Sequence, residues 1–196
     1  MVPGQPAIDL GYMLQPKLVA TNSFRDAPAL DVLLVPGGMG AVTLEQNNDT
    51  SIETFLRQRF DRLDYLLSVC TGSAILASSG LLNGHRATTN KGLWGWVTTH
   101  GENVTWVPSA RWTEDGKIWT SSGVASGEDR IDMMYAFLKH LYGEDDPNLA
   151  TTMNVIEYAP HTDPDWDPFS IVHNVPGHTN GSLESCVRPV GTPSAA

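Results

Sequence analysis

Apolar positions along the chain alternate between short continuous runs and longer stretches with helical spacing. Residues Asp31–Val35, Tyr65–Val69 and Lys117–Ser121 are short runs, as expected of strands buried within a sheet. Residues 52–63 and 131–142 instead place their apolar side chains on one face of a helix. Because strands alternate with helices, the pattern predicts an α/β sandwich with a largely parallel sheet.

Weaker patterns fill the intervals between these elements. We expect short strands at 86–90, 104–106 and 110–112, and helices at 73–82, 93–97 and 148–158. Residues 161–196 are rich in Pro, Gly, Asp and Ser, so we expect them to wrap the surface and then become disordered. The sequence therefore predicts one domain over residues 1–160 followed by a tail.

The segment with the clearest chemical meaning is the turn that follows the Tyr65–Val69 strand. Cys70 stands where this strand ends and the helix at 73–82 begins, which is where open α/β sheets bind their ligands. The N–H groups and dipole of a helix start favour a thiolate at such a position. Backbone N–H groups of Thr71 and Gly72 could also stabilise a developing negative charge. This geometry is that of a nucleophile elbow.

Two features of the sequence also allow plainer interpretations. A lone intracellular cysteine is most often a small buried apolar residue, although the strand, turn and helix around Cys70 favour a reactive thiol. The Pro36–Gly40 segment after the first strand could be a tight turn or could approach a ligand closely. It lacks the full dinucleotide fingerprint and the Lys-Ser/Thr pair of a phosphate-binding loop.

Composition narrows the classes of function. The chain has 196 residues, a net charge of −10 and no basic cluster, which argues against nucleic acid and anionic membranes as partners. Its two cysteines, Cys70 and Cys186, do not suggest a disulfide framework, and no run of residues is apolar enough to span a bilayer. The first residues lack the pattern of a signal peptide, so we expect a cytoplasmic protein.

A metal site in the tail is a weaker possibility. Its candidate ligands match no recognised metal-site spacing; they are His161, Asp163, Asp165, Asp167 and His173. We therefore expect no resident metal and no cofactor.

Four motifs, in order, resemble the ThiJ/PfpI superfamily of class I glutamine amidotransferase-like proteins. They cover residues 30–38, 68–73, 80–89 and 115–124 within a similar region of about residues 11–160. The Cys70-Thr71 pair, in place of the Cys-His of PfpI-type peptidases, is most similar to the isonitrile hydratase-like branch, including its fungal-type members.

This resemblance implies a flavodoxin-like three-layer sandwich, usually dimeric, that acts on a small-molecule substrate. Cys70 would be the nucleophile, backbone N–H groups of Gly38 and Thr71 would stabilise the developing charge, and a carboxylate would handle protons. Gly37, Gly38, Gly72 and Asn90 would line the substrate site.

The amino-terminal segment departs from the family. We expect the opening strand, first helix and second strand of the family to be absent, because residues 3–15 fit best just before the third strand. The catalytic carboxylate would then belong to the absent segment. A rival alignment makes Asp9 that carboxylate, but it needs a deletion far longer than an ordinary loop. An incomplete sheet would leave neighbouring strands with unpaired backbone groups and exposed apolar faces.

Two further departures lie near the expected site. Asn90 stands where many relatives have histidine, and Glu128-Asp129-Arg130 resembles an insertion before the helix at 131–142.

Three hypotheses for function follow. The first is a Cys70-dependent enzyme, a lyase or hydrolase of secondary metabolism, that adds water to a small electrophilic carbon such as an isonitrile or a related carbonyl compound. The second is a non-catalytic or redox-responsive protein in which Cys70 is oxidised. The third, an amidotransferase-like peptidase, is disfavoured because no histidine partner for Cys70 is evident.

Overall fold

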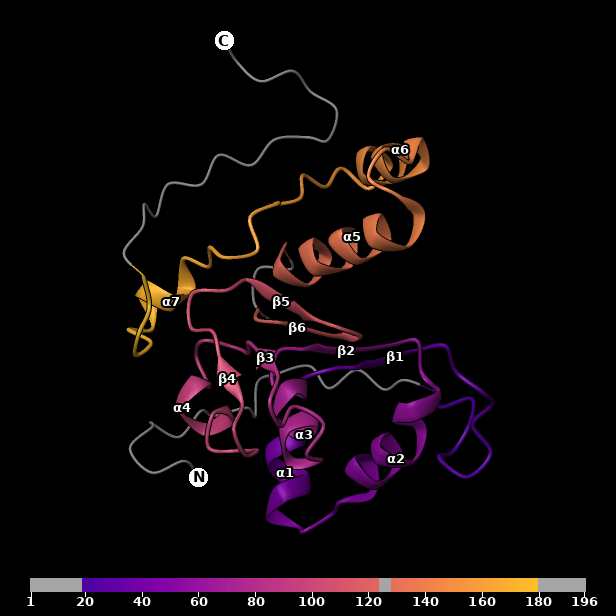
Figure 1. Ribbon diagram of the computed structural model, residues 1–196, viewed down its shortest axis with the longest axis vertical. Helices are drawn as coiled ribbons and strands as arrows, with labels where there is room; N and C mark the ends of the chain where they lie inside the picture. Colours follow the sequence, from indigo (N-terminus) through magenta and orange to yellow (C-terminus); the bar gives the residue numbers. More distant parts are fainter. Residues whose placement is uncertain (1–18, 124–127, 180–196) are drawn as a thin grey trace.

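A mostly parallel sheet forms the centre of the protein, seen here in a computed structural model that describes residues 19–123 and 128–179. Its four strands run in the order β1-β2-β6-β5 (Figure 1). β1, β2 and β6 are parallel, and β5 pairs with β6 as an antiparallel hairpin. The strands are β1 (Val32–Val35), β2 (Tyr65–Val69), β5 (Trp112–Asp115) and β6 (Ile118–Ser121). The three strands expected from the continuous apolar runs are therefore confirmed.

Helices cover both faces of this sheet, which confirms the three-layer α/β prediction (Figure 1). A second, two-stranded parallel sheet pairs β3 (Arg86–Ala87) with β4 (Thr105–Trp106). The helices are α1 (Gly40–Gln46), α2 (Ser51–Arg59), the 3-10 turn η1 (Phe60–Arg62), α3 (Gly72–Ser78), α4 (Trp94–Val97), α5 (Glu128–Tyr142), α6 (Pro147–Val155) and α7 (Phe169–Val172). Among the described residues, none of these helices is long and apolar enough to cross a membrane.

Successive side chains of β2 enter two different cores, because strand residues alternate between faces. Leu66 packs with the side chains of α2 and α3, including Leu56 and Leu76. Leu67 packs on the opposite face with Trp119 of β6 and the side chains of α5. Both leucines are fully buried, so β2 is an interior strand, as its continuous apolar sequence predicted.

β1 lies at an edge of the sheet as the structure describes it. It pairs with β2 on one side only within the described residues. Val32 and Leu34 on one face of β1 are 39% and 43% exposed, whereas Val35 is 5% exposed. Within the described residues, β1 therefore presents apolar side chains beside an unpaired edge. Residues 1–18, including Asp9, lie outside the described part of the chain.

Residues 160–179 do more than wrap the surface. The Arg111 N–H donates to the carbonyl of Pro164 at 2.7 Å, so this segment runs beside the start of β5. Asp167, Ser170 and Val175 are buried. The expectation of a tail beginning at residue 161 therefore missed a segment that contributes to the core, while residues 180–196 lie outside the described part.

The two faces of the sheet allow a direct test of this arrangement. Leu66→Ala should lower the free energy of unfolding by about 2–5 kcal/mol, because it opens a cavity in a closed core. Leu34→Ala should cost less than about 1 kcal/mol, because that side chain remains largely in water. Urea unfolding measures both values, and equal losses would show that the outer face of β1 is covered in solution.

Candidate nucleophile site

Cys70 lies in a strained turn between β2 and α3. Its φ of +58° is uncommon for a residue with a side chain, and such strain persists only where surrounding contacts enforce it. The Cys70 N–H donates to the Ser121 carbonyl at 3.0 Å. The Cys70 carbonyl accepts from the hydroxyls of Ser73 at 2.9 Å and Thr89 at 3.0 Å. Three segments therefore hold the backbone of this residue in the expected elbow.

The loop after β1 passes so close to the elbow that both segments need glycine. A Cβ on Gly37 would lie 2.6 Å from the Cβ of Cys70 and 2.7 Å from the backbone nitrogen of Thr71. A Cβ on Gly72 would lie 2.4 Å from the carbonyl oxygen of Val35. Gly37 and Gly72 therefore allow the loop after β1 to approach the turn at Cys70, which gives a steric reason for glycine at both positions.

Thr71 joins the elbow to Gly38. The Gly38 N–H donates to Thr71 Oγ1 at 2.8 Å, and the same hydroxyl lies 3.1 Å from the Gly38 carbonyl oxygen, to which it can donate. The Gly38 N–H is therefore already bonded to the Thr71 side chain. The resemblance had led us to expect this N–H to stabilise a developing negative charge on the substrate. The sulfur of Cys70 lies 3.9 Å from Thr71 Oγ1, and both side chains are 1% exposed.

The remaining candidate residues have different surroundings. Asn90 is half-buried, and its Oδ1 accepts from the Leu93 N–H at 2.9 Å, so it stabilises the turn before α4. Asp9 lies outside the described residues. The candidate metal ligands of residues 161–173 form no cluster of three or more ligating side chains within the described residues.

The structure adds a buried ionic cluster that sequence reasoning missed. Lys91 and Asp167 are 4% and 0% exposed and lie 3.8 Å apart. Lys91 Nζ also donates to Thr88 Oγ1 at 2.7 Å and to the Ala110 carbonyl at 2.8 Å. Asp167 precedes Pro168, an arrangement typical of a helix start, and its Oδ1 indeed accepts from the N–H of Phe169. The Asp167-Pro168 pair in the sequence could therefore have predicted that Asp167 lies in an ordered turn and not in a loose tail.

A second buried pair attaches the carboxyl-terminal segment to α5. Arg111 donates to Asp132 at 3.1 Å, and Asp132 also accepts from the Tyr158 hydroxyl and from the His161 N–H at 2.7 Å. Burial raises the pKa of Asp132, while the bonds from Tyr158 and His161 and the charge of Arg111 oppose that rise.

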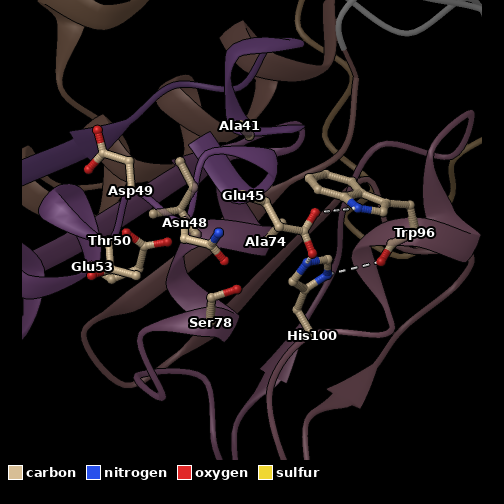
Figure 2. Close-up of a pocket in the computed structure, with 11 residues that line it drawn as sticks. Ala41, Glu45, Asn48, Asp49, Thr50, Glu53, Ala74, Ser78, Trp96 and His100 are labelled. Carbon is tan, nitrogen blue, oxygen red and sulfur yellow. Dashed lines mark hydrogen bonds and ion pairs between the residues drawn. The ribbon is translucent and has the colours of Figure 1, made fainter. Parts of the chain in front are cut away.

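A cavity of about 180 Å³ lies among α1, α2, α3 and α4 (Figure 2). Glu45 of α1 accepts from the Trp96 indole at 2.9 Å and lies 3.2 Å from Nε2 of His100. These contacts fasten α1 to the α4 region. Because α1 begins just after Gly38, they also restrain the loop that meets the elbow.

Comparison with known proteins bears on these features. The model of the DJ-1/PfpI family matches residues 12–139. An isonitrile hydratase from Pseudomonas putida is 34% identical, over 83% of this chain and 67% of its own length.

Solved structures are similar as well. A ThiJ/PfpI family protein from Pseudomonas syringae superposes with a TM-score of 0.60 at 28% identity, over 74% of this chain. The chain spans only 56% of the length of that protein. Drosophila melanogaster DJ-1beta has a TM-score of 0.53 at 18% identity, covering 69% of this chain and 68% of its own, which shows a shared fold.

The close approach of Gly37 to the elbow predicts that adding a methyl group at position 37 lowers stability, whereas adding one at position 40 does not. Gly37→Ala should lower the free energy of unfolding by about 1–3 kcal/mol, because the new methyl group collides with backbone that cannot withdraw easily. Gly40→Ala is the matched control, since a Cβ there meets nothing within 4 Å. The control should leave stability unchanged or raise it by up to about 1 kcal/mol. Equal stability of the two variants in thermal unfolding would contradict the close approach.

Proposed function

The chain belongs to the DJ-1/PfpI family, and we propose that it is a cysteine-dependent hydratase that converts small isonitriles to N-substituted formamides. The observation that carries this proposal is the strained elbow at Cys70, in a chain 34% identical to an isonitrile hydratase. The proposal extends to related small carbonyl compounds as substrates. It also assigns the reaction to secondary metabolism.

The reaction needs a nucleophile, one proton and one water molecule. The thiolate of Cys70 attacks the terminal isonitrile carbon and forms a C–S bond, and the resulting anion takes a proton at that carbon. Water then adds to this thioimidate carbon. The C–S bond breaks, the thiolate leaves, and proton transfer to nitrogen gives the formamide. The sum is one isonitrile plus one water, with Cys70 regenerated.

Two residues of the elbow support this chemistry. The positive φ of Cys70 holds its side chain at the end of β2, where ligands bind in open α/β sheets. The Thr71 hydroxyl lies between the sulfur and the loop at Gly38, so it can orient that loop and donate to a substrate atom. Asp9 remains our candidate for the proton-transferring carboxylate, and Asn90 for a residue beside the substrate.

The similarity to an isonitrile hydratase favours the hydratase over the redox-responsive alternative. Oxidant-sensing thiols are accessible to solvent, whereas Cys70 is 1% exposed. An isonitrile carries no net charge, so it loses less hydration than an ion when it enters such a site. Entry requires the contact between Thr71 and Gly38 to open, which ordinary loop motion can achieve.

Removal of the thiol tests the proposal directly. Cys70→Ser should reduce formamide production from cyclohexyl isonitrile by roughly 1,000-fold or more, because the weaker nucleophile lacks an evident base. Cys186→Ser serves as the matched control and should retain wild-type turnover. Product is measured by chromatography, with circular dichroism to verify folding. Turnover that survives in Cys70→Ser, or is absent from the wild type, rejects the hydratase.

The Thr71 hydroxyl can be tested separately from its bulk. Thr71→Val keeps the side-chain shape but removes both bonds to Gly38, so kcat/KM should fall by about 100-fold, as when one charge-stabilising donor is lost. Thr71→Ser keeps the hydroxyl and should remain within a few-fold of wild type. If valine is as active as serine at this position, the hydroxyl has no part in the reaction.

A further inference from the structure

A buried polar cluster lies beside the elbow but outside the contacts used by the proposed reaction. It consists of Lys91, Asp167 and Ser122, which we call the Lys91 cluster. One oxygen of Asp167, Oδ2, accepts from Ser122 Oγ at 2.6 Å and lies 3.8 Å from Lys91 Nζ. All three side chains are buried, and an ion pair in such a place is tolerated only while both charges remain.

The cluster connects two of the three segments that hold the backbone of Cys70. On one side, Ser122 directly follows Ser121, whose carbonyl accepts from the Cys70 N–H. On the other side, Lys91 donates to Thr88, and the neighbouring Thr89 donates to the Cys70 carbonyl. Asp167 is therefore linked to the elbow through Ser122 and Ser121 on one side, and through Lys91, Thr88 and Thr89 on the other.

Asp167 is itself fixed by the carboxyl-terminal segment. Its N–H donates to the Ser109 carbonyl at 2.8 Å, and its Oδ1 accepts from Phe169 at 2.9 Å. The same segment binds Arg111 through the carbonyl oxygens of Pro164 and Trp166. The carboxylate thus has a defined position rather than that of a side chain on a loose tail.

We propose that Asp167 is a positioning residue for Cys70: it joins Lys91 to Ser122, fixes two supports of the elbow, and balances the Lys91 charge next to those supports. The inference rests on the proposed function in taking Cys70 as the reacting group. It assigns residues 163–179 to the machinery of the site, which neither the sequence motifs nor the family match at 12–139 include.

The other described charges around the site are either balanced or exposed. Arg111 is paired with Asp132, and His161 meets that carboxylate through its N–H. His173 is exposed, and its ring lies near Gly92. The side chains of residues 124–130 lie outside the described part of the structure. Among the described charges, Lys91 and Asp167 form a buried pair that is bonded to two of the segments holding the Cys70 backbone.

The test is the pH dependence of iodoacetamide alkylation at Cys70 in the full chain, followed by peptide mass spectrometry. Asp167→Asn leaves the Lys91 charge unbalanced, which favours the thiolate. The midpoint of alkylation should fall by roughly half a pH unit, about threefold in thiolate fraction below the midpoint, since the charge lies beyond direct contact. Lys91→Met should raise the midpoint. Asp165→Asn, an exposed carboxylate on the same segment, is the matched control and should match the wild type.

A purely structural role would give a different result. If Asp167→Asn lowers the melting temperature but keeps the wild-type midpoint, or shifts it upward, the proposal is overturned. Should Lys91→Met fail to fold, the double variant Lys91→Met/Asp167→Leu removes both charges and should restore the wild-type midpoint; a midpoint equal to that of Asp167→Asn also overturns the proposal. These readouts need no isonitrile, so a failure of the hydratase assay remains a separate result.

Discussion

The site depends on one steric constraint, the approach of the Gly37 backbone to the backbone of Cys70 and Thr71. The 2.6 Å distance from a Cβ on Gly37 to the Cβ of Cys70 leaves no room for any side chain but hydrogen at position 37. Because β1 and β2 are parallel neighbours, their carboxyl ends deliver the two loops to the same edge of the sheet. The strained φ of Cys70 and the pairing of Thr71 with Gly38 both follow from this approach.

Two buried ion pairs lie around this contact. Lys91, in the loop between β3 and α4, pairs with Asp167 of the carboxyl-terminal segment, and Arg111, just before β5, pairs with Asp132 of α5. Removing one partner of a buried pair costs far more than the intact pair contributes. The main effect of these pairs is therefore to fix the position of residues 160–179, and their net contribution to the free energy of unfolding is small. They also link a segment remote in sequence to the supports of the nucleophile.

The fold was largely predictable because its signals are local. Continuous apolar runs identified β1, β2 and β6, and the Cys-Thr-Gly turn placed the elbow between β2 and α3. The role of Asp167 was not predictable in the same way. Its partners Lys91 and Ser122 lie 76 and 45 residues away in the chain. The periodicity of apolar residues predicts local structure and gives no information about contacts at that separation. The engagement of the Gly38 N–H by Thr71 was missed for a similar reason, since it depends on how two loops meet. Composition alone suggested a loose tail from residue 161, but Asp and Pro there also start α7.

The most direct measurement of the central claim is to trap the adduct on the nucleophile. The full-length protein is mixed with excess cyclohexyl isonitrile, quenched with acid within the first turnover and examined by intact-mass and peptide mass spectrometry. The account predicts a mass gain of one isonitrile on the peptide that contains Cys70, decaying as the formamide appears. Formamide that accumulates while Cys70 stays unmodified, or an adduct on Cys186 instead, would contradict it.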